Sequence, residues 1–363
     1  MSFTVLHVAY PLTQVGENAV GGSEQVLTLI DRAAVQAGHQ SMVIAAEGSQ
    51  VSGALIPSPA ARGRLDPEVR TKAQKAHRRI LRDTLSRFPV DLIHFHSLDF
   101  HQYLPDSGTP SLTTLHLPPN WYPAGIFRMR RPHFHLNCVS LSQERACPPS
   151  NVLLPAIPNG VDLGRLQGVS GKREYAVAMG RICPEKGFHF ALDAAKRAGV
   201  DLQLAGEVFP YAASEDYFKS KIVPRLDSRR QFIGPVGINM KRRLLLDARC
   251  LLIPSTVEET SSLVAMEAMA AGTPVIAFAS GALPEIVEHG RTGYIVRNAR
   301  EMARAIEAVD KLDNEECRRT AERRFSAEKM VERYFQAYRR IIARKSTTPE
   351  RVLAMSATSW LVS

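Results

Sequence analysis

The chain has 363 residues, which is enough for two domains of ordinary size. Its hydrophobic content of 45% and charged content of 23% are typical of a globular protein. No run of about 18 apolar residues occurs, so we expect no transmembrane helix. The first residues lack a basic leader, which argues against a secretory signal. The five cysteines are scattered and form no CxxC pair, so we expect neither a disulfide framework nor a zinc site. This cysteine usage fits a protein of the reducing cytoplasm.

The formal net charge of +10 favours an anionic partner. Nucleic acid, an anionic membrane surface and a phosphorylated substrate would each account for it. No nucleic-acid motif is present, and few aromatic residues are interspersed among the basic ones, so nucleic acid is the least favoured of the three.

The first elements in chain order predict a βαβ unit. Residues 3–9 form an apolar strand, a helix follows the Gly21-Gly22 turn and ends before Gly38, and residues 41–45 form the next strand. A Gly-Gly turn at a helix N-terminus suits an anion, although a plain turn is the alternative. It is not the GxGxxG pattern, so a simple dinucleotide-dependent dehydrogenase is disfavoured.

Residues 66–87 predict a long helix that is dense in arginine and lysine, with a thin apolar stripe. Such a run is either a solvated face or a surface that docks on an anionic membrane or another polyanion. Deep insertion into a bilayer is not expected from so narrow a stripe.

Two histidines stand at the ends of predicted strands. His96 follows a strand at 90–95, and His116 follows a strand at 111–115. Ligands of open α/β sheets bind beyond the carboxyl ends of the strands, so both side chains are site candidates. A structural histidine that is satisfied by hydrogen bonds is the alternative for each of them.

Prolines and glycines then gather around the sequence Asn159-Gly160-Val161-Asp162, which indicates a crossing between domains. Strands and helices alternate strictly beyond it, as in a doubly wound domain. The further strands are predicted at 136–140, 151–157, 175–179, 201–205, 231–233, 250–253, 275–278 and 293–296. The further helices are predicted at 188–198, 214–226, 240–248, 281–287 and 325–343, and the chain is helical in character from residue 299.

A glycine-rich turn after the strand at 175–179 carries Arg181 and Lys186 and opens onto a helix. Two cations at the carboxyl end of a strand suit a diphosphate, and each charge-assisted hydrogen bond is worth about 1.5–3 kcal/mol. Two solvated cations on a surface turn are the alternative.

The stretch from Pro254 to Val275 reads as strand, acidic loop and helix N-terminus. Ser261 or Ser262 can cap the helix, whose free N–H groups favour an anion. Glu259 lies in the loop and Glu267 lies inside the helix among small apolar residues. Ionised carboxylates accept hydrogen bonds from adjacent hydroxyls. A phosphate site that has polyol sites on both sides fits a nucleotide sugar.

This stretch resembles the signature of the retaining glycosyltransferases of family four, a GT-B-fold group. Their pattern is an acid, seven residues, and a second acid followed by Ala-Met-Ala, which Glu259 and Glu267-Ala268-Met269-Ala270 match. The Gly180-Arg181…Lys186-Gly187 segment resembles their second signature. The chain departs from the family at 260–262, where Thr-Ser-Ser replaces the usual Gly-Phe-Gly or Pro-Phe-Gly.

The resemblance implies roles for individual residues. Arg181 and Lys186 would bind the donor diphosphate, together with Gly22 and the helix N-terminus at Ser262 and Leu263. Glu267 would bind the ribose hydroxyls. Glu259 and His116 would face the donor sugar as the catalytic residues. The remaining candidates near the sugar or the diphosphate are Gly21, His96, Thr260, Ser261 and Gly281.

The resemblance also implies the architecture: an α/β protein of GT-B fold, with two doubly wound Rossmann-like domains facing across a cleft and a C-terminal helix crossing back. We place the acceptor-side domain at 1–160, the nucleotide-sugar domain at 161–325, the crossing helix at 326–345 and a tail at 346–363.

The predicted function is metal-independent transfer of a hexosyl group, with retention, from a nucleotide-diphosphate sugar to a saccharide or lipid-linked acceptor. No cofactor and no metal are expected. The expected setting is polysaccharide biosynthesis in the cytoplasm, with peripheral contact to the inner face of an anionic membrane as a further expectation. A sugar-nucleotide epimerase of the same fold and a catalytically silent nucleotide-sugar-binding protein are the alternatives.

Overall fold

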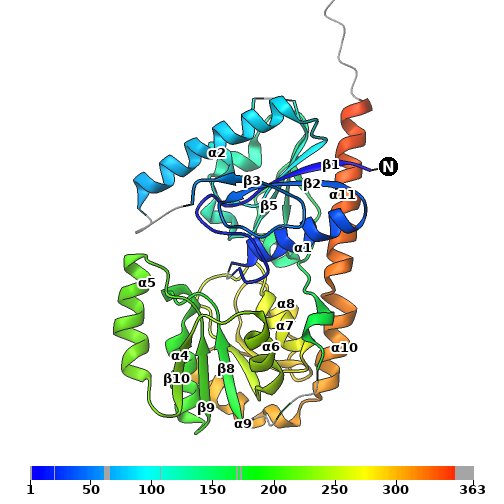
Figure 1. The fold of residues 1–363 in the computed structure, drawn as a ribbon. Coiled ribbons are helices and arrows are strands. Elements are labelled where there is room, and N and C mark those ends of the chain that lie inside the picture. The colour runs from blue at the N-terminus through cyan, green and yellow to red at the C-terminus, as the bar shows by residue number, and fades with distance from the viewer. Residues whose placement is uncertain are drawn as a thin grey trace, which may run out of the picture.

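The computed structural model describes residues 2–19, 21–60, 66–106, 108–168, 171 and 174–347. Two parallel sheets, each covered by helices on both faces, are stacked one above the other, with a cleft between them (Figure 1). The predicted pair of doubly wound α/β units facing across a cleft is therefore confirmed.

The first sheet has the strand order β3-β2-β1-β4-β5-β6-β7. Its strands are β1 (Thr4–Val8), β2 (Gln40–Ala46), β3 (Ala54–Ser58), β4 (Leu92–Phe95), β5 (Ser111–Leu115), β6 (Phe134–Cys138) and β7 (Leu153–Leu154). Its helices are α1 (Gly22–Gln36), α2 (Pro67–Arg87) and α3 (Leu141–Ala146). Almost all side chains of β1, β2, β4, β5 and β6 are buried, because both faces of the sheet are covered.

The second sheet has the strand order β10-β9-β8-β11-β12-β13. Its strands are β8 (Tyr175–Met179), β9 (Asp201–Ala205), β10 (Arg230–Gly234), β11 (Cys250–Ile253), β12 (Val275–Phe278) and β13 (Gly293–Val296). The helices of this half are α4 (Phe188–Arg197), α5 (Ala212–Tyr217), α6 (Ile238–Asp247), α7 (Leu263–Ala270), α8 (Leu283–Ile286), α9 (Ala299–Ala308) and α10 (Asn314–Arg324). Apolar clusters lie on both faces of this sheet as well.

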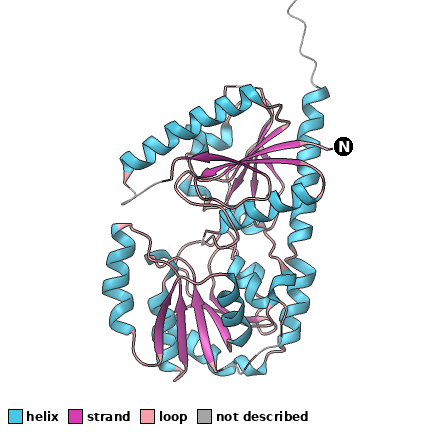
Figure 2. Ribbon diagram, in the orientation of Figure 1, coloured by secondary structure: helices cyan, strands magenta, loops and turns pink. Residues whose placement is uncertain are grey.

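The last helix, α11 (Ala327–Thr347), runs back from the second sheet to the first (Figure 2). Tyr334, Phe335 and Tyr338 on this helix are buried against β1, β4 and α1. The other crossing lies beside it, because Val161 exchanges backbone hydrogen bonds with Phe325 and Ala327. A Cβ on Gly160 would come within 2.5 Å of the Ser326 carbonyl oxygen, so this close approach requires glycine.

Four local predictions need correction. The strand predicted at 151–157 is limited to Leu153–Leu154. The strand predicted at 136–140 runs from Phe134 to Cys138, because Ser140 caps α3, which the sequence analysis missed. The edge strand β3 was also missed, since Pro57 interrupts its apolar pattern. The helix predicted at 214–226 begins at Ala212, passes into a π-helical turn at Phe218 and ends in a 3-10 turn at Val223–Arg225, whose first turn contains Pro224.

Ser346 and Thr347 of the predicted tail continue the backbone of α11, and residues 348–363 lie outside the described residues. All five cysteines are free thiols. None of the helices in the described part of the chain combines the length and apolar composition that are needed to cross a bilayer.

Candidate functional site

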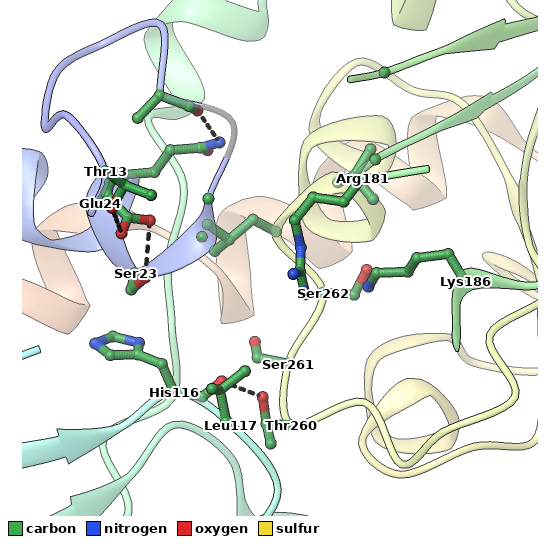
Figure 3. Close-up of a pocket in the computed structure, with 18 of the residues that line it drawn as sticks. Thr13, Ser23, Glu24, His116, Leu117, Arg181, Lys186, Thr260, Ser261 and Ser262 are labelled. Carbon is green, nitrogen blue, oxygen red and sulfur yellow. Dashed lines mark hydrogen bonds between the residues drawn. The ribbon is translucent and has the colours of Figure 1, made fainter. Parts of the chain in front are cut away.

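A cleft of about 560 Å³ lies between the two sheets, where the carboxyl ends of their strands face each other. Residues that line it come from both halves of the chain. Figure 3 shows Glu24 and His116 on one side and Arg181, Lys186 and Ser262 on the other. This is the edge of a parallel sheet at which ligands bind, and here two such edges meet.

The N-terminus of α7 lines the cleft opposite the N-terminus of α1. Ser262 is the N-cap of α7, and its Oγ accepts a hydrogen bond of 3.4 Å from the backbone N–H of Ala265. Leu263 begins the helix and faces Gly22 of α1, where an added Cβ would lie 3.5 Å from the leucine Cδ1. Gly21 precedes α1 and also lines the cleft. Both helix ends direct partial positive charge into the same space.

Arg181 and Lys186 line the second-domain side of the cleft, as predicted for a diphosphate site. The Arg181 side chain is exposed, and within the described residues its guanidinium makes no hydrogen bond or ion pair. The Lys186 ammonium lies 2.6 Å from Glu259 Oε1. Arg181 is therefore the cation that is free for an incoming anion, whereas Lys186 already has a carboxylate partner.

Glu259 is held firmly in the loop before α7. Its side chain is 9% exposed, and it accepts hydrogen bonds from Lys186 and from the Ser255 hydroxyl. Its carbonyl oxygen accepts a hydrogen bond of 2.7 Å from the Ala282 N–H. Gly281 packs directly on this backbone and lines a small adjoining pocket rather than the main cleft. The structure thus places Gly281 behind Glu259, and its expected backbone contact with the diphosphate is not supported by this position.

Glu267 lies in the second turn of α7, is 7% exposed and lines the cleft. One of its oxygens, Oε1, lies 2.5 Å from the ammonium of Lys241 on α6. The other, Oε2, accepts no hydrogen bond from any residue in the described ranges. A carboxylate that is anchored through one oxygen and open at the other can still accept hydroxyl donors.

His116 and His96 are brought together at the first-domain wall of the cleft. His116 Nε2 lies 3.2 Å from His96 Nδ1. Burial lowers the pKa of His116 to about 3, so its imidazole is neutral at physiological pH. The carbonyl oxygen of His116 accepts a hydrogen bond of 2.8 Å from the Thr260 hydroxyl, which ties the two halves together across the cleft.

The Ser261 hydroxyl lines the cleft beside Thr260, and its buried oxygen has no hydrogen-bond partner among the described residues. A buried hydroxyl that lacks a partner is costly unless a ligand or water satisfies it. The Thr-Ser-Ser departure from the family pattern therefore places one interdomain hydrogen bond, one free hydroxyl and one helix cap at the centre of the cleft.

The sequence analysis missed Glu24, Lys241 and Trp121, all of which line the cleft. Glu24 is 5% exposed and accepts hydrogen bonds from Thr13 Oγ1 at 2.7 Å and Ser23 Oγ at 2.8 Å. Its position two residues after the Gly21-Gly22 turn, in the first turn of the helix, was a signal that the sequence offered. Lys241 gave none, because it is 26 residues from Glu267 along the chain.

Part of the chain is similar in sequence to known proteins. Residues 173–310 match the family model described as Glycosyl transferases group 1. This match covers all strands of the second sheet and includes Arg181, Lys186, Glu259 and Glu267. The chain is 33% identical over 156 residues to alpha-maltose-1-phosphate synthase of Mycolicibacterium smegmatis, which is 40% of each chain. Matches to the first three curated relatives span 31% to 40% of those proteins' length.

Solved structures match almost the whole chain. Sucrose-phosphate synthase from Thermosynechococcus elongatus has a TM-score of 0.76 at 20% identity, covering 94% of this chain and 100% of that one. Anabaena HepE in complex with UDP-glucose has a TM-score of 0.72 at 19% identity, covering 93% and 100%. These likenesses establish the GT-B fold for the two sheets and their helices.

Proposed function

We propose that the chain is a retaining hexosyltransferase of family four, which moves a hexosyl group from a nucleotide-diphosphate sugar to a saccharide or lipid-linked acceptor. The observation that carries this proposal is the convergence of Arg181, Lys186, Glu267 and the N-terminus of α7 on one cleft. Two structures with this fold are of Anabaena HepE, one in complex with UDP and glucose and one in complex with UDP-glucose, which supports a nucleotide-sugar donor.

In the proposed reaction the bond between the anomeric carbon and the diphosphate breaks, and its electron pair leaves with the diphosphate. The acceptor hydroxyl forms the new bond on the same face of the sugar and gives its proton to an oxygen of the departing diphosphate. Positive charge aimed at the departing diphosphate lowers the barrier. Arg181 and the N–H groups at Leu263 would supply it, with Lys186 as a further contact. We propose no covalent nucleophile. The cations of the chain, rather than a metal ion, would stabilise the negative charge of the departing diphosphate.

Glu259 would orient the donor sugar, because it is fixed by Lys186, Ser255 and its own backbone. A carboxylate that is held in one position makes its hydrogen bonds to a sugar without further loss of side-chain entropy. His116 on the opposite wall would contact the same sugar. The acceptor would enter from the first-domain side, where Trp121 lines the cleft with 43% of its surface exposed.

The test is a thermal-shift screen of nucleoside diphosphates and their hexose conjugates, because a ligand that binds the native state raises the melting temperature. The best donor is then incubated with saccharide and lipid-linked acceptors, and the products are analysed for the anomeric configuration. An inverted product would refute retention. A rearranged nucleotide sugar formed without acceptor would point to an epimerase, and binding without turnover to a silent protein.

Arg181→Ala should weaken nucleoside diphosphate binding by about 10- to 150-fold, the equivalent of one charge-assisted hydrogen bond. Arg300→Ala is the matched control, because Arg300 is also exposed but lies on α9 and does not line the cleft. Equal affinity in both variants would remove Arg181 from the diphosphate site.

We further propose that α2 docks on an anionic membrane. Its basic side chains are exposed along the helix, namely Arg70, Lys72, Lys75, Arg78, Arg79 and Arg82. Each basic residue near an anionic surface contributes about 1 kcal/mol. Arg70 also lines the cleft, so docking would bring the cleft close to a lipid-linked acceptor. Co-sedimentation with phosphatidylserine vesicles but not with phosphatidylcholine vesicles, lost in a Lys72→Glu/Lys75→Glu/Arg79→Glu variant, is the expected result.

A further inference from the structure

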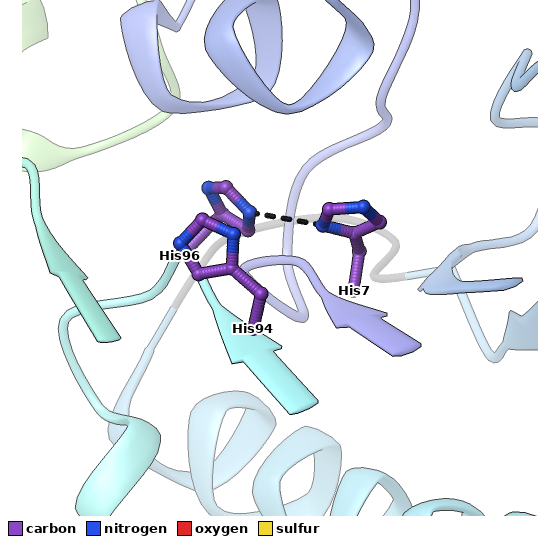
Figure 4. A group of neighbouring side chains, drawn as sticks. All are labelled: His7, His94 and His96. Carbon is purple, nitrogen blue, oxygen red and sulfur yellow. Dashed lines mark hydrogen bonds between the residues drawn. The ribbon is translucent and has the colours of Figure 1, made fainter. Parts of the chain in front are cut away.

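Three histidines form one hydrogen-bonded row from the interior of the first sheet to the cleft. His7 lies on β1, and its Nδ1 is 3.3 Å from Nε2 of His96, which follows β4 (Figure 4). His96 Nδ1 is in turn 3.2 Å from Nε2 of His116, which follows β5 and lines the cleft. Neighbouring parallel strands bring the three rings together, since β1 pairs with β4 and β4 with β5. We refer to His7, His96 and His116 as the histidine row.

Each imidazole of the histidine row is neutral. Burial lowers the pKa of His7 to about 4 and that of His116 to about 3, and it lowers the pKa of His96 well below 6.5. A neutral imidazole carries one N–H and one acceptor nitrogen. The two hydrogen bonds therefore fix all three tautomers together: either every Nδ1 carries the proton, or every Nε2 does.

The inner end of the row separates the two arrangements. His7 is fully buried, and its Nε2 has no hydrogen-bond partner among the described residues. If every Nε2 were protonated, this nitrogen would be a buried N–H without an acceptor. If every Nδ1 is protonated, it is only an unfilled acceptor. Orphaned buried N–H groups are rarer in proteins than under-satisfied acceptors, so the geometry favours protonation at Nδ1.

The neighbouring His94 is not part of this row. Its Nδ1 lies 2.6 Å from the Tyr338 hydroxyl, and its Nε2 lies 2.7 Å from Thr114 Oγ1. Thr114 donates its own proton to Asn137 Oδ1, so it accepts from His94, and Tyr338 donates to the other nitrogen. Both ring nitrogens of His94 are thus occupied. His7, His94 and His96 lie close enough to bind a metal ion, but His94 has no lone pair left for one.

We infer that His7 and His96 are positioning residues that hold His116 as the Nδ1–H tautomer, so that His116 presents a hydrogen-bond donor to an acceptor oxygen of the bound sugar. The oxygen class follows from the donor: a hydroxyl or ring oxygen of the donor hexose satisfies it, whereas an ammonium or amide N–H group of a ligand does not. This inference rests on the proposed function only for the identity of the ligand, because the tautomer itself is a property of the free protein.

The tautomer is measured directly. In the full chain labelled with 15N-histidine at pH 7.5, two-bond 1H–15N correlations distinguish a proton on Nδ1 from one on Nε2. Spectra of His7→Phe, His96→Asn and His116→Gln assign the signals by their disappearance. We expect His7, His96 and His116 to carry the proton on Nδ1 and His94 to carry it on Nε2. A His116 signal with the proton on Nε2 would overturn the inference.

Two variants of His96 test the consequence for turnover. His96→Leu removes the donor to His116 Nε2, which frees that nitrogen to take the proton. His96→Asn places an amide N–H near the position of the original Nδ1. We expect His96→Leu to lower kcat about tenfold, with the affinity for nucleoside diphosphate unchanged, and His96→Asn to restore most of kcat. Equal loss in both variants would mean that His96 only fills space.

Metal analysis of the purified protein tests the alternative that the buried histidines bind a metal ion. One zinc ion per chain, with shifted histidine signals after chelation, would show that His7 and His96 share a metal instead of a proton and would overturn the inference. If His116 has the expected tautomer but no sugar is transferred from any donor, the proposed function fails while the tautomer assignment stands. If sugar is transferred but the proton of His116 is on Nε2, the tautomer assignment fails while the proposed function stands.

Discussion

Replacing Glu267 by glutamine should weaken the binding of the nucleoside part of the donor. The substitution keeps the shape of the side chain and removes its charge. In the structure one carboxylate oxygen is 2.5 Å from Lys241, and the other is not hydrogen-bonded to any described residue. A ribose hydroxyl that bonds to the free oxygen forms a charge-assisted hydrogen bond worth about 1.5–3 kcal/mol. Its loss corresponds to about a 10- to 150-fold increase in Kd.

The difficulty is that Glu267→Gln also breaks a buried ion pair. The side chains of Lys241 and Glu267 are 15% and 9% exposed, so removal of either charge leaves the other largely buried and unpaired. Lys241→Met therefore serves as the control, because it breaks the same pair but keeps the carboxylate. Both variants should unfold at lower urea concentration, but Glu267→Gln should lose more affinity for the nucleoside diphosphate by isothermal titration calorimetry.

The comparison of the two variants decides the assignment. If Glu267→Gln, Lys241→Met and the double variant lose the same affinity, the pair acts as one unit, and Glu267 has no direct bond to the ribose. If Lys241→Met loses more, the ammonium is the ligand, since Lys241 also lines the cleft. Only a larger loss in Glu267→Gln is consistent with the ribose role.

Three further predictions concern stability and are tested by urea unfolding. Gly281→Ala should cost more than Gly290→Ala, because both residues have positive φ but only at Gly281 would the Cβ lie 2.2 Å from the Glu259 carbonyl oxygen; equal losses would mean that backbone strain alone acts. Ser262→Ala should cost about 1 kcal/mol through loss of the helix cap, and no change would show that the cap contributes nothing. Burial lowers the pKa of His77 to about 4, so this side chain binds a proton in the unfolded but not in the native chain between pH 4 and 6.5, and it should lower the free energy of unfolding by up to about 3 kcal/mol as pH drops through that window. The buried histidines His7, His96 and His116 contribute in the same direction, so His77→Leu should reduce the slope without abolishing it, and an unchanged slope would contradict the assignment.

Much of the fold could be predicted because parallel strands in a doubly wound sheet are short, apolar and regularly spaced. The strands at Ser111–Leu115, Tyr175–Met179 and Cys250–Ile253 have the predicted bounds. The errors fall where a single residue competes with the pattern. Pro57 concealed an edge strand, and Ser140 was read as the end of a strand although its side chain caps a helix.

The residues of the candidate site likewise fall into those that could be predicted from the sequence and those that could not. Residues at strand ends and helix N-termini could be predicted, because topology places them at one edge of a sheet. Partners across the cleft could not, since the distance between Lys241 and Glu267, or between Thr260 and the His116 carbonyl group, depends on how two sheets are oriented. The alignment of His7 with His96 likewise depends on strand order, which places β1 directly beside β4.

The position of α11 connects the fold to the chemistry of the cleft. This helix presents Tyr334 and Tyr338 to the first sheet, and both side chains are fully buried. The Tyr338 hydroxyl satisfies His94, and the Tyr334 hydroxyl bonds to Thr114 and Asn137. The His94 ring in turn lies 3.9 Å from that of His96. Phenylalanine in place of Tyr338 would pack as well but would leave a buried imidazole nitrogen without its donor, at a cost of about 1–3 kcal/mol. The crossing helix therefore does more than cover an apolar face, because its hydroxyls fix the ring against which the histidine row is packed.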